Sequence, residues 1–221
     1  MLFKNISILD ENFEIKHHMN VGTDGIRIDY IGSQMPEKDY GRVYEGEGRL
    51  LMCAFYNAHG HSPIALMRGY GENMALQDWL NKRIFPFEDK LDENSVYWGT
   101  LLSMAESMRF GIVSTSDMYY FIDDMVKATV DSGMKGNISR AIVNFDDSDV
   151  WQLPSMKEMK RTFEAYHNTE DERIKMDVSI HAEYTSRPSA VTAVSEYGKE
   201  AGARMNIHVS ETQAEHEECK Q

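Results

Sequence analysis

The stretch RLLMCAFYNAHGH, residues 49–61, joins a largely continuous apolar run to two histidines. Such a run suits a strand that is buried on both faces of a parallel sheet. Alternate residues of a strand point to the same side. His59 and His61 could therefore face one ligand together. We predict that residues 49–58 form the first strand of a parallel sheet, with this pair of histidines at its end.

Downstream of this run, strand-like and helix-like segments alternate. Each of four further apolar segments precedes a segment with helical periodicity; the four are 112–120, 137–145, 175–184 and 203–211. In the first long helix the pattern predicts a buried face made of Tyr97, Leu101, Met104, Ala105 and Met108. In the next helix it predicts one made of Ile122, Met125, Val126 and Thr129. Five strands, each followed by a helix, indicate an α/β fold with a parallel sheet.

Two architectures share this alternation, an open doubly wound sheet and a (β/α)₈ barrel. A dinucleotide-binding sheet should carry a G-x-G-x-x-G turn after an early strand. The nearest segment, Gly69-Tyr70-Gly71, has Met74 in place of the third glycine. Residues 1–50 instead contain short β-like segments without helical periodicity. We therefore predict two parts, a small β unit at 1–50 and a strand–helix unit at 51–221.

Charge and composition exclude several classes of partner. The chain has 23 Lys and Arg against 36 Asp and Glu, a formal net charge of −13, which disfavours binding to nucleic acid and to anionic membranes. No apolar run approaches the 18 residues of a membrane span, and MLFKNISILDENFEIK does not resemble a signal peptide. The two cysteines, Cys53 and Cys219, fit a reducing compartment. We expect a cytoplasmic protein.

Polar side chains stand at the carboxyl end of each predicted strand, which is where barrel enzymes carry their chemistry. In chain order these residues are His59 and His61, then Asp117, then Arg140, then His181, Glu183 and Tyr184, and finally His208 and Glu211. Four of the eight histidines are therefore at strand ends.

A lone histidine is more often a surface or core residue than a metal ligand. An H-x-H pair is more specific because both imidazoles can reach one ion. His208 would add a third nitrogen from another strand end, and Glu211 would lie within reach of a water molecule on that ion. Together these residues favour a metal-dependent hydrolase.

Several motifs extend this pattern; they are NAHGH at 57–61, LMRGYGENMALQDWL at 66–80, FPFEDKL at 85–91, TSDMYY at 115–120, SIHAEYTSRP at 179–188 and HVSET at 208–212. In order and spacing they resemble the amidohydrolase superfamily over nearly the whole chain. The similarity is to the branch with S-adenosylhomocysteine and 5′-methylthioadenosine deaminases and triazine chlorohydrolases. It implies a (β/α)₈ TIM barrel of amidohydrolase type, of which this chain holds about five units, with a small N-terminal β-sandwich unit.

The resemblance also implies a reaction, the deamination of an aminated purine nucleoside by a metal-activated hydroxide. His59, His61 and His208 would bind one divalent ion, with zinc as the first choice and Fe²⁺ or Ni²⁺ as alternatives. Glu211 would take a proton from the water molecule and deliver it to the ring nitrogen, and would also contact the substrate.

The same resemblance assigns the other substrate contacts. It places Glu88 on the ribose hydroxyls, Arg140 in the substrate pocket, His181 beside the ring or the attacked carbon as a catalytic and binding residue, and Trp79 over the base. Each of these residues also has a structural interpretation. Glu88 could be a solvated helix acid, Arg140 could pair with Asp146 or Asp147, His181 could fill the barrel mouth, and Trp79 could belong to the core.

In this family a sixth-strand histidine and an eighth-strand aspartate complete the metal site, and neither is found in the 221 residues. We therefore expect the N-terminal part of a longer enzyme, with little activity alone. Its predicted partners are an adenosine-type small molecule and either further copies of itself or a C-terminal half that supplies the rest of the barrel. Two alternatives stay open. One is hydrolysis of another ring C–N or C–Cl bond, as in guanine deaminases or triazine chlorohydrolases, and the other is a non-catalytic metal-binding remnant.

Overall fold

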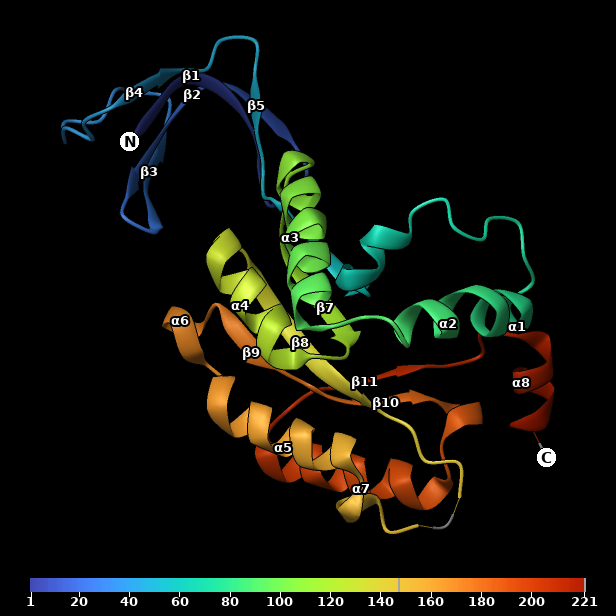
Figure 1. Ribbon diagram of the computed structural model, residues 1–221. Coiled ribbons are helices and arrows are strands. Elements are labelled where there is room, and N and C mark those ends of the chain that lie inside the picture. The colour runs from blue at the N-terminus through green and yellow to red at the C-terminus, as the bar shows by residue number, and fades with distance from the viewer. Residues whose placement is uncertain (147, 221) are drawn as a thin grey trace. The chain divides into compact units, whose positions relative to one another are not determined.

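The chain divides into two compact units, Met1–Ala54 and Phe55–Gln221 (Figure 1). The computed structural model describes residues 1–146 and 148–220. The first unit extends four residues beyond the predicted boundary because Leu50 and Leu51 pair with Ser7 and Ile8. Within the described ranges no helix combines the length and the apolar character needed to cross a membrane.

The first unit is a mixed five-stranded sheet, blue to teal in Figure 1. Its strands are β1 (Leu2–Leu9), β2 (Ile15–Asp24), β3 (Arg27–Gly32), β4 (Val43–Glu45) and β5 (Leu50–Leu51). The order is β3-β2-β1-β4, and β5 also pairs with β1. Ile6, Ile8 and Val21 form its small core. A second sheet facing this one is not found in the described part of the unit, so the sandwich stays a prediction.

The second unit is built on a parallel sheet in the order β11-β10-β8-β7-β6. Its strands are β6 (Phe55–Gly60), β7 (Ile112–Tyr119), β8 (Lys135–Ile142), β10 (Val178–Ala182) and β11 (Met205–His208), and β9 (Ile174–Met176) also pairs with β8. This arrangement confirms the predicted alternation of strands and helices.

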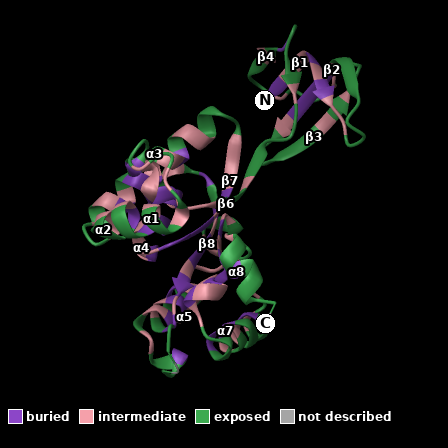
Figure 2. Ribbon diagram, turned by 90° about the vertical axis from the view of Figure 1, so that its right-hand side faces the viewer, coloured by how far each residue is buried: buried purple, intermediate pink, exposed green. Residues whose placement is uncertain are grey.

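Helices connect these strands. The longer ones are α3 (Glu93–Arg109), α4 (Ile122–Ser132), α5 (Pro154–Tyr166) and α7 (Pro188–Ala201), and the six-residue α8 (Gln213–Glu218) follows β11. The shorter ones are the 3₁₀ helices η1 (Ser62–Met67), η3 (Val150–Gln152) and η4 (Glu183–Thr185), the π-helix η2 (Leu80–Ile84), and α1 (Leu76–Trp79), α2 (Phe85–Glu88) and α6 (Thr169–Glu172). Buried residues, purple in Figure 2, gather where α5 and α7 pack on the sheet, for example Met156, Ile180 and Val194.

The predicted helix faces have different outcomes. The buried face predicted for α4 is confirmed. Of the face predicted for α3, Met104 is buried as predicted, but Ala105 and Met108 are exposed, and the other buried residues are Val96, Gly99 and Thr100. The reason is a close approach: a Cβ atom on Gly99 would lie 2.4 Å from the carbonyl oxygen of Pro63. Helix α3 therefore turns its smallest residue toward η1.

The prediction of one buried strand over residues 49–58 is also wrong. The apolar run is divided between β5 of the first unit and β6 of the second. Phe55 and Tyr56 in β6 are 56% and 67% exposed. Strand β6 stands at the end of the sheet order, and within the described residues it pairs only with β7.

Candidate active site

Three histidines converge at the carboxyl ends of the outermost strands. One imidazole nitrogen each of His59, His61 and His208 lies within 4.8 Å of the others. His59 and His61 come from the end of β6, and His208 ends β11. These strands are at opposite ends of the five-strand order. In a flat sheet, four spacings of about 4.8 Å would separate them by roughly 19 Å. The sheet must therefore curve strongly, as a barrel sheet does.

The chemistry of this cluster fits a divalent metal ion. Burial lowers the pKa of His59, and burial together with the neighbouring histidines lowers the pKa of His208 to about 4, so both rings are neutral near pH 7. His61 Nδ1 lies 2.6 Å from the carbonyl oxygen of Met118. This contact assigns a proton to Nδ1 and turns Nε2 away from the Met118 carbonyl. Three imidazole nitrogens at these distances are a donor set that zinc accepts.

A buried carboxylate anchors the turn that follows His61. The backbone N–H of Ser62 lies 3.1 Å and 3.2 Å from the two oxygens of Asp117 and donates to them. Asp117 is only 1% exposed, and burial raises its pKa. The end of β7 thus holds the chain immediately after the second histidine.

Glu211 is presented beside the histidines by the start of α8. Its backbone N–H donates to Glu215 Oε2 at 2.7 Å, within a capping box formed by Thr212 and Glu215. The preceding residue, Ser210, has a left-handed backbone with φ of 53°. The Tyr184 hydroxyl donates to Glu211 Oε2 at 3.1 Å. The carboxylate therefore has a defined position on a constrained turn.

His181 lies next to this group at the end of β10. Its ring centroid is 5.3 Å from that of His208, and its Nδ1 is 3.1 Å from Thr185 Oγ1. Burial lowers the pKa of His181, which favours the neutral ring.

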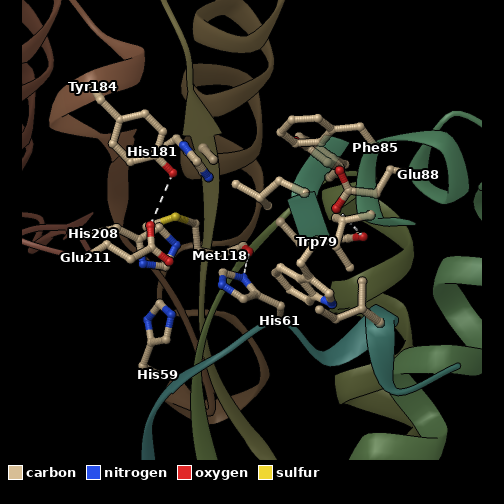
Figure 3. Close-up of a pocket in the computed structure, with 16 residues that line it drawn as sticks. His59, His61, Trp79, Phe85, Glu88, Met118, His181, Tyr184, His208 and Glu211 are labelled. Atoms are coloured by element: carbon tan, nitrogen blue, oxygen red, sulfur yellow. Dashed lines mark hydrogen bonds between the residues drawn. The ribbon is translucent and has the colours of Figure 1, made fainter. Parts of the chain in front are cut away.

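A cavity of about 340 Å³ opens beside the histidines. Its polar lining includes the three histidines, His181, Tyr184, Glu88 and Glu211, and its apolar and aromatic lining is made of Ile64, Trp79, Leu80, Ile84, Phe85, Met118, Tyr119, Tyr120 and Ala141. Figure 3 shows His59, His208 and Glu211 at one end, Trp79, Phe85 and Glu88 at the other, and His61 between them. The size and the apolar lining suit a small planar ligand.

Glu88 is held by a tyrosine from the sheet. The Tyr119 hydroxyl donates to Glu88 Oε1 at 2.7 Å. Burial raises the pKa of Glu88, and the bond from Tyr119 offsets only part of that rise. Glu88 is thus a half-buried cavity residue rather than a solvated helix acid.

Arg140 does not line the cavity. Its Nε donates to Glu158 Oε2 at 2.7 Å, and its Nη1 donates to the carbonyl oxygen of Ala141 at 2.6 Å. Ala141 faces the cavity, whereas the neighbours of Arg140 at alternate positions, Ile138 and Ile142, are buried in the cores beneath the helices. Arg140 therefore points to the helix layer. Its partner is Glu158 rather than the predicted Asp146; Asp147, the other predicted partner, lies outside the described residues.

Sequence reasoning missed several cavity residues, chiefly Tyr119, Tyr120, Ile84 and Phe85. The two tyrosines belong to the motif TSDMYY at a strand end, and that position could have suggested them. Ile84 and Phe85 lie between η1 and α3, in a connection whose course no strand or helix periodicity indicates.

The sequence profile of the amidohydrolase family matches residues 50–221. A 5-methylthioadenosine/S-adenosylhomocysteine deaminase from Thermoanaerobacter pseudethanolicus is 36% identical over 100% of this chain and 52% of its own length. A 5′-deoxyadenosine deaminase from Methanosphaera stadtmanae is 33% identical over 97% of this chain and 50% of its own length. The chain thus spans about half the length of these relatives.

Solved structures show the same fold at lower identity. An adenosine deaminase from Xanthomonas campestris with bound zinc superposes with a TM-score of 0.80 at 21% identity, covering 100% of this chain and 52% of that one. A guanine deaminase from C. acetobutylicum with bound guanine gives a TM-score of 0.83 at 16% identity, covering 97% and 54%.

Proposed function

Because the chain belongs to the amidohydrolase family, we propose that it carries the metal-binding and nucleoside-binding part of a hydrolytic deaminase. The proposed substrates are adenosine-type nucleosides such as 5′-methylthioadenosine. The observation that carries the proposal is the convergence of three histidine nitrogens within 4.8 Å at one end of a cavity that Glu211 also lines.

His59, His61 and His208 would hold one divalent ion, which we propose to be zinc because all three donors are imidazole nitrogens. Fe²⁺ and Ni²⁺ are alternatives with the same preference for imidazole. When bound, the ion would make water a nucleophile at neutral pH.

Glu211 would carry the proton. Deamination forms a bond between the oxygen of water and the ring carbon and breaks the bond to the exocyclic amine, so the water oxygen gives up two protons, one to the ring nitrogen and one to the amine that leaves as ammonia. The Glu211 carboxylate lines the cavity beside the histidines, and the Tyr184 hydroxyl fixes one of its oxygens. His181, neutral and half-buried, would contact the ring near the reacting carbon.

The relatives from T. pseudethanolicus and M. stadtmanae are named for substrates that share an adenosine core. In this chain we propose that Trp79 covers the base and that Glu88 accepts hydrogen bonds from the ribose hydroxyls; both line the cavity. Arg140 is left out of the substrate contacts because Glu158 holds it on the helix side. A homo-oligomer, a partner that supplies further barrel strands, and a cytoplasmic location all stay predictions.

The first test is the metal content of the purified chain, measured together with its intact mass. We expect about one zinc per chain, near zero in His59→Ala, and unchanged content in His216→Ala, which removes an exposed histidine on α8. Adenosine, 5′-methylthioadenosine and guanine would then be compared as ligands. Zinc that survives His59→Ala, or guanine bound in preference to both nucleosides, would contradict the proposal.

A further inference from the structure

We infer that Tyr119 is a positioning residue that fixes the Glu88 carboxylate in the cavity and thereby makes the site select ligands with free ribose hydroxyls. The inference rests on the proposed function, since it concerns the sugar of an adenosine-type ligand. Tyr119 would act through Glu88 rather than on the base or the reacting carbon.

The two residues belong to different elements, and one hydrogen bond joins them. Tyr119 ends β7, is 5% exposed, and packs in a core cluster with residues such as Val96 and Ile122. Glu88 is half-buried and stands at the end of the helical segment that runs through α1, η2 and α2, in the long connection between η1 and α3. The 2.7 Å bond from the Tyr119 hydroxyl ties the carboxylate at the end of this segment to the end of the sheet.

In this hydrogen bond Tyr119 is the donor and Glu88 the acceptor. Burial and the adjacent Glu88 charge raise the pKa of Tyr119 far above its usual value, so its hydroxyl stays protonated and donates. Burial raises the pKa of Glu88, and the bond from Tyr119 offsets part of that rise. Because Oε1 accepts the bond from Tyr119, the carboxyl group is oriented with its other oxygen toward any hydrogen-bond donor that a ligand brings.

One oxygen of Glu88 is available for such a ligand. Oε1 is taken by Tyr119, whereas Oε2 has no hydrogen-bond partner among residues 1–146 and 148–220. Glu88 lines the cavity at the end away from His59 and His208 (Figure 3). A nucleoside whose base lies toward the histidines would bring its sugar toward this end, where the 2′ and 3′ hydroxyls can donate.

Tyr120 offers a matched control. It follows Tyr119 in the chain and lines the same cavity, but the guanidinium of Arg140 packs on its ring at 4.7 Å, and its hydroxyl makes no hydrogen bond to the described residues. Removing either hydroxyl leaves a phenylalanine of nearly the same shape. Only removal of the Tyr119 hydroxyl should reduce the preference of the site for ligands with free ribose hydroxyls.

The experiment measures dissociation constants of the zinc-loaded 221-residue chain for adenosine and 2′,3′-dideoxyadenosine, by calorimetry. The proteins are the wild type, Tyr119→Phe, Tyr120→Phe, Glu88→Gln and the double variant Tyr119→Phe/Glu88→Gln. We expect the wild type to prefer adenosine about tenfold, as for a hydrogen bond to a charged group. Tyr119→Phe should lose most of this preference while binding the dideoxynucleoside unchanged. Tyr120→Phe should keep the preference, and in the Glu88→Gln background Tyr119→Phe should have no further effect.

The outcomes separate the inference from the proposed function. If the wild type binds neither nucleoside, the proposed function fails and the inference fails with it. If the wild type prefers adenosine but Tyr119→Phe keeps that preference, or weakens both ligands equally, only the inference is overturned. Zinc content and circular dichroism check that each variant is folded. If Tyr119→Phe does not fold, Glu88→Asp, which withdraws the carboxylate from the Tyr119 hydroxyl, must lose the same preference, and a retained preference overturns the inference.

Discussion

Substitution of Gly99 by alanine links helix packing to the metal site. Gly99 lies in α3 against the backbone of η1, and an added Cβ would meet the Pro63 carbonyl oxygen at 2.4 Å and its carbonyl carbon at 3.1 Å. Replacing an exposed helical glycine by alanine usually raises the free energy of unfolding by about 1 kcal/mol. Overpacking against backbone that cannot rotate away costs about 1–3 kcal/mol. We therefore expect Gly99→Ala to lower the free energy of unfolding by about 1 kcal/mol, which corresponds to a fall in Tm of roughly 2–4 °C.

The effect should reach the metal because η1 begins directly after His61. Relief of the contact requires η1 to move by up to about 1 Å, given ordinary carbon–oxygen contact distances. Displacement of a ligand's supporting structure typically weakens metal binding by about 10- to 100-fold. We therefore expect Gly99→Ala to bind zinc at least about tenfold more weakly than the wild type.

Two assays test this reasoning, urea unfolding of the metal-free chain and competitive zinc titration. The control is Ala105→Gly, at an exposed position of the same helix. In Ala105→Gly the lower helix propensity of glycine should reduce the free energy of unfolding by about 1 kcal/mol, and the zinc affinity should stay that of the wild type. If Gly99→Ala proves as stable as the wild type and binds zinc equally well, the close packing of α3 on η1 does not position His61.

Three further predictions concern other parts of the second unit. The pKa of His208 is lowered from about 6.5 to about 4, so the unfolded chain binds this proton before the folded chain as the pH falls. The contribution of His208 to the free energy of unfolding of the metal-free chain should be fully present above about pH 6.5 and should decline toward pH 4. Urea unfolding of His208→Asn should show a shallower decline over the same range. Arg140→Met breaks the bond to Glu158 and should lower the free energy of unfolding by about 2 kcal/mol, with the adenosine affinity within about twofold of wild type; the opposite pattern would return Arg140 to the substrate pocket. Met156→Ala should cost about 2–5 kcal/mol in urea unfolding because Met156 is fully buried in the core under α5, and a loss below 1 kcal/mol would show that this core is loosely packed.

Local periodicity predicted much of the fold. The face of α4 could be read correctly because its apolar residues follow the helical period without interruption. The face of α3 could not, because a tertiary contact at Gly99 decides which side is buried. The strand at 49–58 failed for a related reason: hydropathy does not show that a continuous apolar run crosses from one compact unit to another.

The candidate site shows the same division. His59, His61, His208 and Glu211 could be named from the sequence because strand ends carry chemistry in barrels and the residue types are specific. The resemblance placed Arg140 in the substrate pocket, whereas its bond to Glu158 holds it on the helix side. Because both faces of a central parallel strand are buried, the sequence alone does not show which face meets the cavity. The roles of these residues stay predictions until metal and ligand binding are measured.

The curvature that brings His208 beside His59 also has a kinetic consequence. His208 and His59 come from strands at opposite ends of the sheet order, and every strand–helix unit between them must be in place before the three imidazole nitrogens meet. Contacts this distant in sequence form late and slow the folding reaction. Tight zinc binding would then report that the last strand has docked, so the rate at which a refolding chain captures zinc would measure the final step of its assembly.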